Sequence, residues 1–169
     1  MSNLTGKQLV EQGIITGPIE EENIAQHGVD LNLIRVQKIS GSWKPGFVFL
    51  EQKTRLAEKL DIHPTDDGAF CYWELSPGTY DVTLAQGCKV PEDKMLLIRQ
   101  RSSLLRNGTI LHSSVFDAGF ETENIGTVIV VTEPICIEVN ARVAQIYAHN
   151  SNIVENLYDG QFQKDCQRK

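Results

Sequence analysis

The segment Arg99–Gly108 holds the side chains in this sequence that are best suited to bind anions. Its sequence, RQRSSLLRNG, places three arginines and two serines in ten residues of a chain whose formal net charge is −6. Guanidinium groups donate paired hydrogen bonds that match phosphate oxygens, and serine hydroxyls and backbone N–H groups add further donors. The segment therefore predicts a polyphosphate ligand. The alternative is a solvated basic turn that pairs with surface carboxylates.

Asp117 is the candidate catalytic residue. It lies in LHSSVFDAGF (residues 111–120), where it follows an apolar pair and precedes a turn of small residues. Such a context can hold a carboxylate at the rim of a pocket, where a general base acts. An ordinary turn aspartate that accepts bonds from nearby backbone N–H groups is the alternative.

Two further segments offer polar groups to a ligand. Gln145 lies in the alternating run RVAQI (residues 142–146), and an inward glutamine amide needs partners that a ligand can supply. Tyr158 and Gln163 lie near the C-terminus in YDGQFQ (residues 158–163). That segment can fold over a bound ring, or it can be a frayed tail.

Mainly β structure must position these side chains. Thr5 as an N-cap and Gly13 as a stop predict one short helix over residues 4–15, and TRLAEKL (residues 54–60) is a second candidate. TVIVV (residues 127–131) is apolar on both faces, which predicts a strand buried between two layers. Alternation predicts further strands at residues 29–36, 80–84, 135–139 and 142–146. Frequent turn signals favour a β-sandwich or distorted barrel, with residues 43–70 as a peripheral hairpin and loop.

Composition limits the classes of function. A chain of 169 residues with 41% hydrophobic residues predicts one domain over residues 1–169. The acidic balance argues against a nucleic-acid partner. No apolar run approaches the ~20 residues of a membrane span, and the polar N-terminus lacks a signal-peptide core, so we expect a cytoplasmic protein without a membrane partner. The cysteines lack paired zinc-ligand spacing, and the H-x-E and P-C-x-x-C signature of zinc deaminases is absent, so we expect free thiols at Cys71, Cys88, Cys136 and Cys166.

Taken in order, the segments resemble the dUTPase and dCTP deaminase superfamily over nearly the whole chain. The matching runs are HGVDLNL (27–33), LSPGTY (75–80), VPED (90–93), RSSLLRNG (101–108), FDAGF (116–120) and RVAQI (142–146). The N-terminal helix and the ending at residues 158–163 are similar to the deaminase-like branch, which includes archaeal dUTPases. They differ from the common trimeric dUTPases with a glycine-rich tail.

The resemblance implies a distorted, jelly-roll-like β-barrel and a homotrimer with active sites shared between subunits. It also implies a deoxynucleoside triphosphate substrate with Mg²⁺ held mainly through the phosphates. Asp117 would lie beside the sugar and orient or deprotonate the attacking water. Tyr158 and Gln163 would cover the nucleotide, with residues 156–169 as a candidate mobile segment. The phosphates would be bound by Arg101, Ser102, Ser103, Arg106 and Gln145.

The resemblance also separates two reactions. Deaminases of this superfamily use a glutamate in the strand after the D-x-G-[FYW] turn, and that position falls here at Val128, or at Thr127. Neither side chain transfers a proton as a carboxylate does, and Glu121 or Glu123 could substitute only if the turn folded back into the pocket. We therefore predict a dUTP diphosphatase that yields dUMP and pyrophosphate, in nucleotide-pool sanitation and dUMP supply. The alternatives are a dCTP deaminase, mono- or bifunctional, and a non-catalytic nucleotide-binding regulator.

Three positions depart from the family pattern. Gln100 replaces the usual glycine before RSSL, the turn at residues 121–124 is longer than its usual counterpart, and Asn140-Ala141 replaces a glycine-containing turn. We expect the first to tighten the space near the phosphates and the second to lie near the base. These changes bear on base preference more than on the fold.

Overall fold

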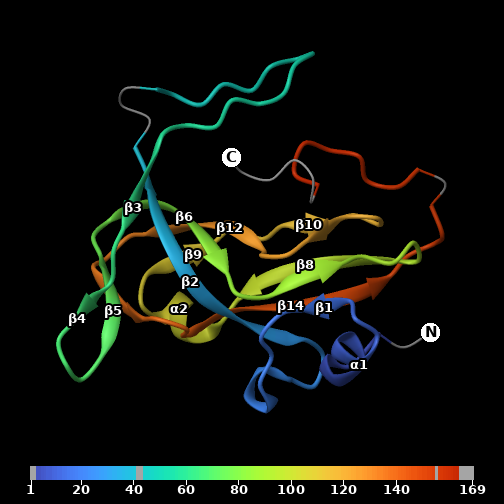
Figure 1. Ribbon diagram of the computed structural model, residues 1–169, viewed down its shortest axis with the longest axis horizontal. Coiled ribbons are helices and arrows are strands. Elements are labelled where there is room, and N and C mark those ends of the chain that lie inside the picture. The colour runs from blue at the N-terminus through green and yellow to red at the C-terminus, as the bar shows by residue number, and fades with distance from the viewer. Residues whose placement is uncertain (1–2, 41–43, 155, 164–169) are drawn as a thin grey trace.

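The computed structural model describes residues 3–40, 44–154 and 156–163, and it is mainly β (Figure 1). Its main sheet has the strand order β10-β8-β14-β2-β6-β12-β9, and β3 pairs with β2 beside this path. The strands pair antiparallel, and the sheet curls into a half-barrel, which confirms the predicted fold class. Its strands are β2 (Val29–Ile39), β3 (Lys59–Ile62), β6 (Gly78–Leu84), β8 (Lys94–Gln100), β9 (Thr109–Leu111), β10 (Val115–Phe116), β12 (Gly126–Val131) and β14 (Arg142–Asn150).

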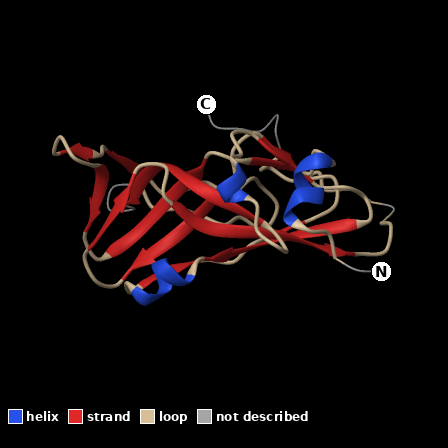
Figure 2. Cartoon of the chain, turned by 90° about the horizontal axis from the view of Figure 1, so that it is seen from below, coloured by secondary structure: helices blue, strands red, loops and turns tan. Residues whose placement is uncertain are grey.

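Two small sheets and three short helices complete the described elements. One small sheet joins β1 (Ile15–Thr16), β7 (Gly87–Lys89) and β11 (Glu121–Thr122), and the other joins β4 (Thr65–Asp66), β5 (Cys71–Leu75) and β13 (Ile135–Glu138). The helices are α1 (Gly6–Glu11), η1 (Glu21–Asn23) and α2 (Ser102–Arg106). In Figure 2 these helices are blue, and the strands, which dominate the fold, are red. Within the described residues no helix has the length and apolar character of a membrane span.

The predicted N-terminal helix is confirmed, including its cap. The Thr5 hydroxyl accepts a bond from the Gln8 N–H at 3.3 Å, and the Gln8 side chain accepts one from the Thr5 N–H at 2.9 Å. This reciprocal capping box satisfies two N–H groups that a helix start leaves open. Leu9, which is fully buried, anchors the helix on the core.

The predicted helix over residues 54–60 is wrong. Phe47 and Arg55 exchange two backbone hydrogen bonds, at 2.8 and 2.9 Å, and β3 already begins at Lys59. Cross-chain pairing therefore satisfies the backbone here, and short-range helix propensity yields to it. Described residues 44–58 form an arm that projects from the ends of β2 and β3 (Figure 1), in line with the expected peripheral hairpin.

Alternation along β12 corrects the expectation that both of its faces are buried in the core. Thr127, Ile129 and Val131 are buried, while Val128 and Val130 are only partly buried. Successive side chains of a strand point to opposite faces. The second apolar face therefore has another use, and Val128 lines a pocket. The largest fully buried core side chains are mainly aliphatic, and they include Leu31, Leu33, Leu84, Leu96, Ile98, Ile125 and Ile146.

Candidate active site

The residues expected to bind phosphates lie where β8, α2 and β14 meet. Ala144 on β14 is opposite Gln100 at the end of β8, and the Arg101 N–H donates to the Val143 carbonyl oxygen at 3.0 Å. Helix α2 begins at the next residue, so strand pairing fixes its start. The arginine–serine cluster gathered there consists of Arg101, Ser102, Ser103, Arg106 and Gln145.

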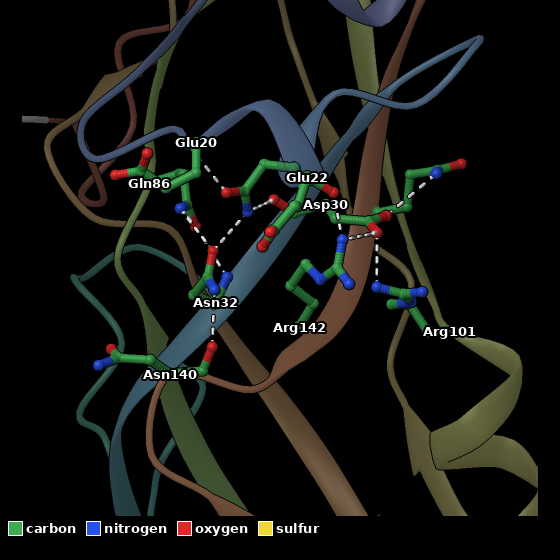
Figure 3. Close-up of polar contacts among 10 residues, drawn as sticks. Glu20, Glu22, Asp30, Asn32, Gln86, Arg101, Asn140 and Arg142 are labelled. Carbon is green, nitrogen blue, oxygen red and sulfur yellow. Dashed lines mark hydrogen bonds and ion pairs between the residues drawn. The ribbon is translucent and has the colours of Figure 1, made fainter.

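Asp30 is the buried partner of this cluster. It lies on β2, is only 6% exposed, and accepts hydrogen bonds from Arg101 Nη1 at 2.6 Å and Gln145 Nε2 at 3.1 Å. Arg142 Nη1 lies 3.9 Å from the same Asp30 Oδ2 (Figure 3). Two guanidinium groups thus share one carboxylate, and Arg142 also donates to the Glu22 carbonyl oxygen. Guanidinium groups carry several donors each, so this pair can still offer hydrogen bonds to an anionic ligand.

Sequence analysis did not single out Asp30 and Arg142 as site residues. Asp30 was read only as part of HGVDLNL, and Arg142 only as a strand residue. The available signal was an acidic residue between apolar neighbours in a predicted strand, because a buried carboxylate needs a partner. Sequence alone did not identify that partner, since Arg101 is 71 positions away.

Asn32 organises a second polar network beside Asp30. Its side-chain oxygen accepts from Asn23 Nδ2 at 2.6 Å and Gln86 Nε2 at 2.9 Å. Its amide nitrogen donates to the Asn140 carbonyl oxygen at 2.6 Å (Figure 3). These bonds tie β2 to the β13–β14 turn and to η1. Buried amides satisfied in this way rigidify their surroundings.

Other members of the cluster face solvent. Ser102, Ser103 and Arg106 are exposed on α2. Gln100, the residue before Arg101, binds the backbone of β9 through its side-chain amide. Its Oε1 accepts from the Leu111 N–H at 2.8 Å, and its Nε2 donates to the Thr109 carbonyl oxygen at 3.3 Å. These two hydrogen bonds join the end of β8 to β9, next to the start of α2.

Asp117 lies in a different part of the chain, at a pocket of about 810 Å³ that we call the Asp117 pocket. This volume is in the range of small-molecule sites. Strands β6 and β12, the turn at residues 117–120 (the pocket turn), the arm and the C-terminal segment (described residues 156–163) all contribute to it. Its lining includes Lys53, Thr54, Leu56, Lys59, Asp81, Val115, Phe116, Asp117, Phe120, Thr122, Asn124, Thr127, Val128, Tyr158, Gln161 and Phe162.

Aromatic rings form one wall of the Asp117 pocket. The centroids of Phe116 and Phe120 are 5.3 Å apart, and Tyr158 meets Phe120 edge-on at 5.2 Å. The Tyr158 N–H also donates to the Ala118 carbonyl oxygen at 2.8 Å, which holds the C-terminal segment against the turn. Such a wall offers a planar apolar ligand both contact area and favourable ring geometry.

Gln163 and Gln161 hold the C-terminal segment in different ways. Gln163 uses its amide on the backbone of the turn, accepting from the Glu121 N–H at 3.0 Å and donating to the Gly119 carbonyl oxygen at 2.8 Å. Gln161, which sequence analysis did not single out, lines the pocket and accepts from the Thr54 N–H at 2.8 Å. The segment is therefore fastened to both the turn and the arm. The arm, whose role the sequence left open, is part of the pocket wall.

The acidic groups of the pocket are few. Val128 and Thr127, the expected positions of a deaminase glutamate, both line it, and the Thr127 hydroxyl donates to the His112 carbonyl oxygen at 3.0 Å. Among the described lining residues, the carboxylates are Asp81 and Asp117. Asp117 is exposed at the turn, where it is accessible to a ligand.

Within one chain the arginine–serine cluster and the Asp117 pocket are separate. None of Arg101, Ser102, Ser103, Arg106, Gln145 and Gln163 is among the described residues that line the pocket. The predicted site residues thus fall into the cluster on β8, α2 and β14, and the pair Asp117 and Tyr158 in the pocket, with Gln163 bracing the pocket from behind.

None of the described cysteines lines the Asp117 pocket or belongs to the arginine–serine cluster. Cys88 lies on β7 beside the pocket turn, and burial, helped by the charge of Glu121, raises its pKa to about 12. It therefore stays a protonated thiol rather than a nucleophile. Cys71 and Cys136 are exposed and, like Cys88, free, as expected, whereas Cys166 lies outside the described residues.

Comparison with known proteins identifies the family of this chain. A sequence model of the dCTP deaminase-like family matches residues 1–150. The chain belongs to the dCTP deaminase-like family. A probable deoxyuridine 5′-triphosphate nucleotidohydrolase of Halobacterium salinarum is 33% identical over 150 residues, which cover 88% of this chain and 87% of the relative. The deoxyuridine 5′-triphosphate nucleotidohydrolase of Methanocaldococcus jannaschii is 34% identical over 143 residues, covering 84% and 88%.

A solved structure supports the same fold. The 2′-deoxycytidine 5′-triphosphate deaminase of Agrobacterium tumefaciens superposes with a TM-score of 0.59 at 15% identity, covering 86% of this chain and 47% of that chain. This chain therefore spans about half the length of that deaminase. The dCTP deaminase-like match ends at residue 150, so the described residues of the C-terminal segment that line the pocket lie beyond it.

Proposed function

We propose that this protein is a dUTP diphosphatase that hydrolyses dUTP to dUMP and pyrophosphate. The observation that carries the proposal is the Asp117 pocket. It has the size and aromatic wall for a nucleoside and an accessible carboxylate at its turn, while β12 presents Val128 and Thr127 where a deaminase would need a carboxylate. The names of the archaeal relatives support the same reaction.

In the proposed mechanism each group has one task. The aromatic wall and Tyr158 hold the nucleoside, and Asp117 orients or deprotonates the water that attacks the phosphate chain. Arg101, Arg106 and the two serines bind the phosphate oxygens and offset the charge that develops in the transition state. Gln145 is positioned to assist by its bond to Asp30.

Magnesium enters this proposal together with the triphosphate. The ion neutralises phosphate charge and keeps several waters when substrate phosphates bind it. Among the described residues no group of three His, Cys, Asp or Glu side chains is arranged to hold a metal. The substrate in the proposal is accordingly the magnesium complex of dUTP.

The proposed assembly is a homotrimer in which the arginine–serine cluster of one subunit faces the Asp117 pocket of a neighbour. The separation of the two regions within one chain supports it. Light scattering tests the mass, and mixing tests the sharing of sites. Subunits carrying Asp117→Asn, unfolded and refolded together with Arg106→Ala subunits, should recover about one quarter of wild-type activity, because that share of mixed sites is intact. Recovery of no activity would contradict shared sites.

The reaction itself is tested by incubating dUTP, dCTP and dTTP with Mg²⁺ and measuring pyrophosphate and ammonia separately. We expect pyrophosphate from dUTP, and a fall of roughly 10²–10⁴-fold for Asp117→Asn. Asp61→Asn is the matched control, because Asp61 is a surface carboxylate paired with Arg35. Full activity of Asp117→Asn, or no pyrophosphate from dUTP, would contradict the proposal. Ammonia from dCTP would favour the deaminase, and tight dUTP binding without turnover the regulator. A cytoplasmic location stays a prediction.

A further inference from the structure

Asp81 on the wall of the Asp117 pocket has one carboxylate oxygen without a partner. Its Oδ2 lies 2.5 Å from Lys59 Nζ, and the two side chains are 15% and 19% exposed. Its Oδ1 is buried and has no hydrogen-bond partner among the described residues. A buried acceptor in this state is costly, so it needs an explanation.

The strand register places Asp81 on the wall of the Asp117 pocket. Asp81 on β6 is directly opposite Val128 on β12, so the two side chains share the face turned away from the core. Asp81, Lys59 and Val128 all line the pocket. The side chains of Asp81 and Lys59 therefore border the same space as the aromatic wall formed by Phe116, Phe120 and Tyr158.

The other buried atom without a partner provides a contrast. Thr109 Oγ1 is the second such atom in the described part of the chain, and Thr109 does not line the pocket. A hydroxyl is neutral, whereas a carboxylate is charged and its lone pairs need donors more strongly. The open oxygen of Asp81 combines charge, burial and a place in the pocket, and a ligand N–H would complete its bonding.

We propose that Asp81, held by Lys59, reads the Watson–Crick edge of the uracil ring. Oδ1 accepts the N3–H of the ring, and the Lys59 ammonium group donates to a neighbouring ring carbonyl oxygen. Cytosine carries a lone pair instead of a hydrogen at N3, so the carboxylate repels it. Thymine has the same edge as uracil and is not distinguished by this pair. The inference rests on the proposed function, since it assumes that the pocket takes the base of dUTP.

Asp81→Asn tests this assignment because it inverts the hydrogen bond. Lys59 requires an acceptor, so the amide oxygen turns toward it and the NH₂ group faces the ring, where it suits cytosine N3. The measurement is the calorimetric affinity for the α,β-imido analogues of dUTP, dCTP and dTTP, which resist hydrolysis. We expect the preference for the uracil over the cytosine analogue to fall at least about tenfold, with uracil and thymine weakened equally.

The outcomes separate recognition from a structural ion pair. Asp61→Asn, which removes an exposed carboxylate from the pair with Arg35 outside the pocket, should keep the wild-type preferences. An Asp81→Asn variant with wild-type ratios between the three analogues, whatever its overall affinity, overturns the proposal. So does Asp81-dependent ammonia release from dCTP, which would assign the carboxylate to deamination.

A second measurement uses the wild-type protein, in case the variant does not fold. In the complex with the ¹⁵N3-labelled uracil analogue, the N3 imino proton should exchange with water at least about tenfold more slowly than in the free nucleotide. Exchange at the free rate, or no binding of any analogue, overturns the inference. Neither measurement needs turnover. Absence of pyrophosphate release would therefore contradict the proposed hydrolysis without deciding the role of Asp81.

Discussion

The surroundings of Asp30 and the Asp117 pocket differ in the kind of structural element that forms them. Asp30, Arg101 and Gln145 lie on or next to paired strands and are joined by the hydrogen bonds that Asp30 accepts, beside the network centred on Asn32. Strands supply only part of the Asp117 pocket, and the rest comes from a turn, the arm and the C-terminal segment. The side chains around Asp30 are therefore positioned by the main sheet. The shape of the Asp117 pocket depends instead on contacts between the pocket turn, the arm and the C-terminal segment.

This difference has an energetic consequence. The Asp30 carboxylate is buried and its two arginine partners are partly exposed, so a change at Asp30 disturbs the folded state as well as ligand binding. Asp117 is exposed at its turn. A change at Asp117 should therefore alter binding and turnover while the free energy of unfolding stays nearly constant.

The largest effect on stability is expected for Asp30→Asn. The substitution leaves Arg101 and Arg142 close together without the carboxylate that they share. We expect a loss of about 2–3 kcal/mol in the free energy of unfolding, below the range of a fully buried pair because both arginines are partly exposed. Urea unfolding measures it. The matched control, Asp61→Asn, should cost less than about 1 kcal/mol, since its pair with Arg35 is exposed. Equal losses would remove the distinction between the two regions.

Gly119→Ala tests the pocket side. Gly119 has a φ of +85°, and a Cβ there would lie 2.7 Å from Leu157 Cβ and 3.2 Å from the Tyr158 nitrogen. The C-terminal segment must then move off the turn, so we expect KM for dUTP to rise about tenfold, a loss of ~1.4 kcal/mol in binding. Limited proteolysis should cut the segment faster.

Gly68→Ala is the matched control for that experiment. Gly68 has nearly the same φ, +86°, but a Cβ there meets nothing within 4 Å. It carries the backbone strain without the clash. A KM change of the same size in both variants would show that strain, and not the contact with the segment, is responsible.

The buried thiol of Cys88, on β7 beside the pocket turn, should make the free energy of unfolding depend on pH. Its pKa is raised from 9.0 to about 12 by burial and by Glu121. The unfolded thiol loses its proton first, so stability is constant below pH 9 on this account and falls as the pH rises toward 12. At pH 10 the loss is about 1.4 kcal/mol. Wild type and Cys88→Ala should converge in stability across this range in urea titrations, and parallel curves would contradict the assignment.

Sequence predicted the strand-built parts best. The segments 29–36, 80–84 and 142–146 alternate, and each lies within a strand of the main sheet. Only the resemblance to the superfamily indicated that the RSSL segment lies beside RVAQI. Asp30 was missed because its partners come from distant strands, and no local pattern shows that a carboxylate in β2 will meet Arg101.

The loop-built parts were predicted least well. Residues 54–60 have helix-forming composition, yet the pairing of Phe47 with Arg55 decides their conformation. Gln163 was expected to cover the nucleotide, which stays a prediction, and the sequence did not indicate that its amide binds the backbone at Gly119 and Glu121. Which partners these residues bind depends on which backbone N–H and carbonyl groups elsewhere in the fold are unpaired. That is decided only when the whole structure has formed.

The smallest expected effect concerns Asn140 in the β13–β14 turn. Asn140 has a φ of +66°, a conformation that asparagine tolerates better than other side chains. Its backbone binds both Asn32 Nδ2 and the Leu33 carbonyl oxygen, so a substitution that keeps the conformation keeps the network. Asn140→Gly should stay within about 0.5 kcal/mol of wild type, and Asn140→Ala should cost about 1 kcal/mol. Urea midpoints at constant m-value measure both. Equal stability of the two variants would mean that the turn adapts, and the region around Asp30 would then be less rigid than its hydrogen bonds indicate.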